Sequence, residues 1–127
     1  MSNLGEWYVL VVEDEPDGQD VVVQILDLYN IATEVVSTAE KALTRLDQAA
    51  YTAVVIDLNL PGMDGIELVR AIREHKRLHA LPCVAITAYH SSAVKQQALA
   101  SGFDAYFPKP LDDTAFVREL ERVITQG

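Results

Sequence analysis

The sequence predicts an α/β domain in which a parallel five-stranded sheet lies between two layers of helices. Five short apolar runs, most of them continuous and rich in β-branched residues, suit parallel strands that are covered on both faces. Amphipathic helical patterns alternate with these runs, and the connections are short. Because right-handed crossovers place helices on both faces of a parallel sheet, the pattern indicates a doubly wound (βα)₅ three-layer sandwich.

The expected strands follow directly from the apolar runs. They are YVLVV (8–12), ATEVV (32–36), AVVID (53–57), CVAIT (83–87) and DAYF (104–107). The second run is the most polar of the five, so we expect it at an edge of the sheet.

Capping patterns mark the starts of two helices. Ser37 precedes Glu40 by three residues, and Asp64 stands in a similar relation to Glu67, so both pairs predict capping boxes. The helix expected over about 91–101 has a much weaker apolar pattern, with Val94, Ala98 and Leu99 as its inward positions. Few inward contacts predict a loosely held element of low local stability.

Length and composition define the class of protein. The 127 residues fit one domain, expected over 1–127 with its core at about 8–125 and no effector domain. The formal net charge of −9 argues against direct binding of nucleic acid, because phosphates would be repelled. Cys83 is the single cysteine, and no apolar run is long enough for a membrane span. We therefore expect a soluble cytoplasmic protein.

Polar residues follow the strands at the edge where such folds bind ligands. Glu13 and Asp14 follow the first run, Asp57 and Thr87 end the third and fourth, and Lys109 follows the fifth. Each alone has an ordinary explanation as a cap, a turn or a solvated loop residue. Together they predict that three carboxylates, a hydroxyl and an ammonium meet on one rim.

Such a cluster has a chemical consequence. Two unit charges about 4 Å apart repel by about 4 kcal/mol at an effective dielectric near 20, so the acids must keep protons or bind a cation. Hard oxygen ligands suit Mg²⁺. A carboxylate beside Mg²⁺ and an ammonium is suited to act as an aspartyl-phosphate nucleophile.

These motifs resemble the response regulator receiver domain family of two-component signalling. The resemblance covers about 8–125 and rests on VEDEP, VVIDLNLPGMDG, AITA and FPKP, in that order and at the spacing of successive βα units. It implies a CheY-like, flavodoxin-like fold with sheet order 2-1-3-4-5. It also implies that Asp57 accepts a phosphoryl group from a histidine kinase or phosphotransfer protein.

The resemblance assigns a role to each site residue. Glu13, Asp14, Asp57 and the backbone carbonyl of Asn59 match the Mg²⁺ ligands of the family. Thr87 matches its switch hydroxyl, Lys109 its phosphate-pairing lysine, and Tyr106 the aromatic residue that moves inward with Thr87. A cis Lys109-Pro110 peptide is implied as well. The acidic pair is Glu-Asp here rather than two aspartates.

The predicted function is a phosphorylation-activated signalling switch. The output is expected through a surface formed by the fourth helix, the fifth strand and the fifth helix, which would bind a downstream protein. The chain would promote its own phosphorylation and dephosphorylation without turning over external substrates. Its oligomeric state is expected to be a monomer or a weak dimer, without contact to a membrane.

Two alternatives remain open at the level of the sequence. A Mg²⁺-dependent phosphatase with an aspartyl-phosphate intermediate would share this chemistry. Such enzymes typically carry a second acid two residues after the nucleophile, where this chain has Asn59, which has no ionisable proton to give. A receiver-like module that binds a partner without being phosphorylated is the other alternative, although all five site residues are present.

Overall fold

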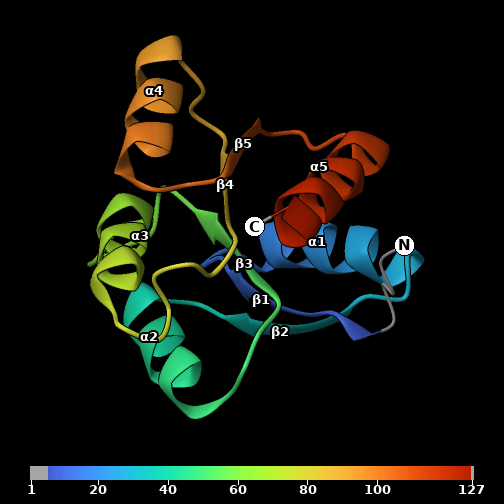
Figure 1. The fold of residues 1–127 in the computed structure, drawn as a ribbon. Helices are drawn as coiled ribbons and strands as arrows, with labels where there is room; N and C mark the ends of the chain where they lie inside the picture. The colour runs from blue at the N-terminus through green and yellow to red at the C-terminus, as the bar shows by residue number, and fades with distance from the viewer. Residues whose placement is uncertain (1–5, 127) are drawn as a thin grey trace.

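The computed structural model describes residues 6–126, and within this range the chain forms five parallel strands and five helices. The elements alternate along the chain, as Figure 1 shows. They are β1 (Tyr8–Val12), α1 (Pro16–Leu28), β2 (Ala32–Val36), α2 (Ala39–Gln48), β3 (Ala53–Asp57), α3 (Gly65–Glu74), β4 (Cys83–Thr87), α4 (Ser92–Ser101), β5 (Ala105–Pro108) and α5 (Asp113–Gln126). Residues 1–5 and 127 of the expected domain lie outside the described range.

The sheet has the order β2-β1-β3-β4-β5, and every neighbouring pair is parallel, as the sequence predicts. The polar strand β2 lies at an edge. Because β1, β3 and β4 occupy the centre, the ends of these strands that carry the acids and Thr87 meet at one rim of the sheet.

Two apolar cores fill the spaces on the two faces of the sheet. Helices α1 and α5 cover one face, and α2, α3 and α4 cover the other (Figure 1). Neighbouring strand residues alternate between the cores: Leu10 belongs to the core under α2 and α3, and Val11 to the core under α1 and α5. Burial on both faces explains why the central strands are continuously apolar.

The helix caps were predicted in part. The box of Asp64 and Glu67 is present at α3, with the side chain of each accepting a backbone N–H from the other. The prediction for α2 is wrong by one residue, because Thr38 is the cap and its hydroxyl accepts the N–H of Lys41. Glu40 instead contacts the loop that follows β3, where its carboxylate accepts the N–H of Met63 at 3.4 Å.

Helix α4 is the least embedded helix of the described chain. Ala98 is its one buried residue, Val94 is half-buried, and the side chain of Leu99 is 42% exposed rather than inward. Its C-terminus is better fixed, because the guanidinium of Arg73 donates to the carbonyl of Gly102 at 2.9 Å and to Asp104. The helix is therefore anchored at its end and weakly held along its length.

Candidate functional site

Three carboxylates meet where β1 and β3 end. Glu13 is fully buried and Asp57 is 5% exposed, whereas Asp14 is half-buried. One carboxylate oxygen of each lies within 4.8 Å of the others. Neighbouring ligands of an octahedral Mg²⁺ stand about 3 Å apart and opposite ones about 4 Å, so this oxygen set fits Mg²⁺ after a small contraction.

Lys109 joins two of these acids. Its ammonium donates to Glu13 Oε1 at 2.6 Å and to Asp57 Oδ2 at 2.9 Å. Burial lowers the pKa of Lys109, but the hydrogen bonds to the two carboxylates outweigh this effect, and the net pKa is raised. Lys109 therefore stays positively charged beside Asp57. The Lys109-Pro110 peptide is cis, as expected.

Glu13 has a closely fitted environment. Its Oε2 accepts the N–H of Glu15 at 3.3 Å. Burial raises the pKa of Glu13; the hydrogen bond from Lys109 opposes this, the charge of Asp57 reinforces it, and the net shift is upward. A Cβ atom at Gly18 of α1 would lie 2.2 Å from Glu13 Oε1, so only glycine leaves room for this side chain as it lies here.

The loop after β3 orients Asp57. The N–H of Asn59 donates to Asp57 Oδ1 at 2.8 Å, which is the local turn bond expected of an aspartate before a Pro-Gly turn. At the start of α3, a Cβ atom on Gly65 would lie 2.7 Å from the carbonyl oxygen of Asp57. The close approach of α3 to the backbone of Asp57 thus depends on a residue without a side chain.

Thr87 ends β4 and is 1% exposed. Its hydroxyl donates to Asn59 Oδ1 at 2.8 Å and accepts the N–H of Tyr89 at 3.0 Å. Its carbonyl accepts the N–H of Lys109 at 2.8 Å, which ties the ends of β4 and β5 together. In this structure the single hydroxyl proton of Thr87 is thus given to Asn59.

Tyr106 of β5 points inward and is 9% exposed. Its hydroxyl lies 2.9 Å from His90 Nδ1. Burial raises the pKa of Tyr106, so the phenol keeps its proton. No sequence pattern indicates this contact, because His90 lies in a loop and pairs with a residue sixteen positions further along the chain.

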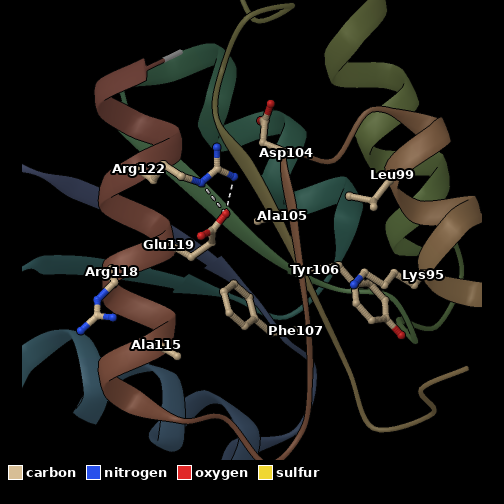
Figure 2. A pocket seen from close by; sticks show the side chains of 10 residues that line it. All are labelled: Lys95, Leu99, Asp104, Ala105, Tyr106, Phe107, Ala115, Arg118, Glu119 and Arg122. Carbon is tan, nitrogen blue, oxygen red and sulfur yellow. Dashed lines mark hydrogen bonds and ion pairs between the residues drawn. The ribbon is translucent and has the colours of Figure 1, made fainter. Parts of the chain in front are cut away.

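A hollow of about 450 Å³ lies over β5, between α4 and α5. Figure 2 shows its lining, with Phe107 and Tyr106 from β5 at the centre and Arg118 and Arg122 from α5 at one side. Leu99 and Lys95 line it from α4, and Glu119 pairs with Arg122. The surface expected to carry the output is therefore a concave mixture of apolar and charged groups.

The structure brings the predicted site residues to one rim. Asp57, Glu13 and Lys109 are in direct contact, and Asp14 lies beside them. Asn59 links the loop after β3 to Thr87. Sequence reasoning missed Gly18 and Gly65, although a glycine in the first turn of a helix is a signal of close approach that could have identified both.

Comparison with known proteins identifies the family. Residues 9–121 match the model of the response regulator receiver domain, so this chain belongs to the response regulator receiver domain family. Receiver domains are phosphorylated by histidine kinases in two-component systems and bind Mg²⁺ at an acidic pocket.

The relatives differ in how much of their length this chain spans. It is 34% identical over 122 residues to a 14.6 kDa protein encoded in the sodA1 3′ region of Leptolyngbya boryana, covering 96% of this chain and 93% of that protein. It is 31% identical over 127 residues to the transcriptional regulatory protein ResD of Bacillus subtilis, covering 100% of this chain but 52% of ResD.

A solved structure shows the same fold with a bound metal. The receiver domain of the sensor histidine kinase PA1611 from Pseudomonas aeruginosa superposes with a TM-score of 0.86 at 28% identity, covering 94% of this chain and 98% of that one. That domain has a magnesium ion coordinated in its active-site cleft. Among residues 6–126 of the present chain, no helix combines the length and apolarity that crossing a membrane requires.

Proposed function

We propose that this chain is a phosphorylation switch in which Asp57 accepts a phosphoryl group from a histidine kinase or phosphotransfer protein. One observation carries the proposal: the nearly buried carboxylate of Asp57 lies between an acidic pair and the ammonium of Lys109, which is 2.9 Å away. A lysine bonded to the acceptor offsets the charge that a transferred phosphoryl group brings.

A carboxylate oxygen of Asp57 attacks the phosphorus of a phosphohistidine, and the P–N bond breaks as the O–P bond forms. The electron pair stays on the donor imidazole, which takes a proton from solvent. Water later attacks the acyl phosphate, releases inorganic phosphate and restores Asp57. Residues 1–127 thus act as one receiver domain that modifies only itself.

Oxygen atoms of four residues at this rim would hold Mg²⁺. Glu13, Asp14, Asp57 and the backbone carbonyl of Asn59 would bind the ion. When bound, Mg²⁺ neutralises charge on the acids and on the phosphoryl group. The longer side chain of Glu13 reaches the cluster because Gly18 leaves space for it.

Thr87 and Tyr106 would carry the signal away from Asp57. The phosphoryl oxygens compete with Asn59 Oδ1 for the hydroxyl proton of Thr87, which now bonds Asn59 at 2.8 Å. A phosphoryl group carries about −1.5 to −2 charge at neutral pH and is the stronger acceptor. Movement of Thr87 would alter the contacts of Tyr106 and shift the α4–β5–α5 surface, where the downstream protein binds.

The other partners follow from charge and composition. A net charge of −9 opposes direct contact with nucleic acid, so the proposed output is a contact with a protein. The chain would act as a monomer or weak dimer in the cytoplasm. This chain is 32% identical over 119 residues to the sensor protein GacS of Pseudomonas syringae, and the matching segment makes up 13% of the length of GacS. A sensor protein of this kind is a suitable donor.

Incubation with Mg²⁺ and acetyl phosphate, followed by intact mass measurement, tests the proposal. The wild type should gain one phosphoryl group, and Asp57→Asn should gain none. Asp20→Asn is the matched control because it makes the same chemical change at an exposed position of α1. Amide hydrogen exchange on the same samples should change in α4 and β5 but not in α2, and Thr87→Val should suppress that change without preventing phosphorylation.

Three results would contradict the proposal. They are a wild type without an adduct, an adduct that persists in Asp57→Asn, and steady hydrolysis of an external phosphate ester. The last result would indicate the phosphatase alternative. The absence of any adduct together with binding of a partner protein would indicate a module that works without phosphorylation.

A further inference from the structure

His90 and Tyr106 form a contact that the proposed transfer chemistry does not use. The hydroxyl of Tyr106 lies 2.9 Å from Nδ1 of His90, and their ring centroids are 5.5 Å apart at an interplanar angle of 49°. We assign the tautomer with the ring proton of His90 on Nε2, in which the phenol of Tyr106 donates to Nδ1. The two side chains therefore make one specific hydrogen bond as well as a ring contact.

The hydrogen bond explains how Tyr106 can lie inward. A buried hydroxyl without a partner is costly, and a tyrosine that turns toward the interior must satisfy its O–H there. His90 meets this need from an exposed position, while the ring of Tyr106 is 9% exposed. Loss of the acceptor would favour a conformation in which the hydroxyl reaches water.

His90 also stands at the start of the weakly held helix. It directly precedes Ser91, the cap of α4, whose hydroxyl accepts the N–H of Val94 at 3.1 Å. Ala98 is the one buried residue of α4, so the first turn of this helix has few packing contacts with the rest of the described chain. The bond from Tyr106 to His90 thus connects β5 to the beginning of α4.

The inward position of Tyr106 coexists here with Thr87 bonded to Asn59. The hydroxyl of Thr87 donates to Asn59 Oδ1 and not toward Asp57. The two proposed switch residues are thus not locked to one another in this structure. The side chain of His90 and the backbone of the next residue, Ser91, both contact the hydroxyl of Tyr106 at its inward position.

We propose that His90 is a positioning residue that holds Tyr106 inward before any phosphoryl group arrives and ties this position to the first turn of α4. Its importance for output rests on the proposed switch function, but the positioning itself does not. His90 thereby sets the fraction of unphosphorylated molecules in which Tyr106 already points inward at the α4–β5–α5 surface.

Nuclear magnetic resonance of the full chain with ¹³C-labelled tyrosine rings tests the proposal, without Mg²⁺ or phosphodonor. Tyr106→Phe assigns the signal. His90→Leu removes the acceptor, and His90→Asn keeps an acceptor oxygen at the branch position of Nδ1. His79→Leu is the matched control, because His79 is exposed and the contact it makes with Arg73 uses its backbone carbonyl.

The size of the expected effect follows from the net free energy of one hydrogen bond between neutral groups, which is about 1 kcal/mol. In His90→Leu the ratio of inward to outward Tyr106 should fall about fivefold, with amide exchange in the first turn of α4 rising by about the same factor. The wild type, His90→Asn and His79→Leu should share one ring signal. Exchange in α2 should not change in any variant.

Two results would overturn the proposal. One is a Tyr106 signal in His90→Leu that matches His79→Leu, and the other is an outward Tyr106 in His90→Asn as well as in His90→Leu. Tyr106→Phe gives an independent check from the other side of the bond, since it should raise exchange at the start of α4 alone. This experiment contains no phosphodonor, so a negative result here would not contradict the proposed phosphorylation of Asp57. In the same way, a failure to phosphorylate Asp57 would not contradict the positioning of Tyr106 by His90.

Discussion

At the scale of single residues, Glu13 and Gly18 form a matched pair. A Cβ atom on residue 18 would lie 2.2 Å from Glu13 Oε1, and the carboxylate is already held by Lys109 at 2.6 Å. We predict that Gly18→Ala weakens Mg²⁺ binding and phosphorylation in the wild type. In Glu13→Asp the same change should lower the free energy of unfolding by less, because the oxygen at 2.2 Å is gone, although the Cγ atom that aspartate keeps lies 3.1 Å from the new Cβ.

Urea unfolding of the four proteins of this double-mutant cycle measures the effect. The effects of the two single substitutions on the free energy of unfolding should not add, since the shorter acid relieves part of the clash that alanine creates. Simple additivity across the cycle would contradict the pairing of Glu13 with Gly18.

At the scale of elements, Glu34 joins β2 to α2 and to β1. Arg45 Nε donates to Glu34 at 2.5 Å, and the hydroxyl of Tyr8 donates to it at 2.7 Å. Hydrogen bonds from Arg45 and Tyr8 lower the pKa of Glu34 to about 2. Because the folded pKa is the lower one, the stabilisation is present above the unfolded pKa near 4.5 and is lost as the pH falls toward 2.

Glu34→Gln should therefore be less stable than the wild type at pH 7, and the difference should disappear as the pH approaches 2. Urea midpoints of both proteins across this range give the measurement. A difference that stays constant with pH would show that Glu34 contributes by packing and not by its charge.

At the scale of the whole molecule, a metal on the acidic rim should stabilise the entire fold. Glu13 and Asp57 lie at the ends of the neighbouring inner strands β1 and β3, so opening the site means opening the sheet. Mg²⁺ at ten times its dissociation constant should raise the free energy of unfolding by about 1.4 kcal/mol if it binds only the folded state.

Sodium chloride at equal ionic strength is the control, because a chain with a net charge of −9 is also stabilised by general screening. The Mg²⁺ effect should exceed that of sodium chloride and should disappear in Asp14→Asn. Equal shifts with both salts would argue against a specific site.

The sequence predicted the parallel sheet and the rim residues because these depend on patterns that burial imposes along the chain, whereas the strand order came from the resemblance to receiver domains. The fifth strand was placed one residue early, at 104–107 instead of Ala105–Pro108. Two adjacent hydroxyls, Ser37 and Thr38, can both cap a helix, and the spacing to Glu40 favoured the wrong one. The exposure of Leu99 was also missed, because helical spacing shows which residues share a face but not how far the neighbouring helices extend over it.

Contacts between distant loops were beyond the reach of the sequence. The bonds from Thr87 to Asn59 and from Tyr106 to His90 depend on how the loops at the rim approach one another. No periodicity encodes such pairs, and a lone exposed histidine gives no indication of its partner. The acids and Lys109 could be grouped in advance because each follows directly from a strand.

The fit of Glu13 against Gly18 limits the order in which substitutions can accumulate. With glutamate at position 13, any side chain at position 18 would meet its carboxylate, since a Cβ atom there would lie 2.2 Å from Oε1 and 2.7 Å from the carboxyl carbon. Glycine at position 18 therefore has to be present first. Once glutamate is established, the glycine can no longer be replaced without cost, so the glutamate keeps position 18 from changing.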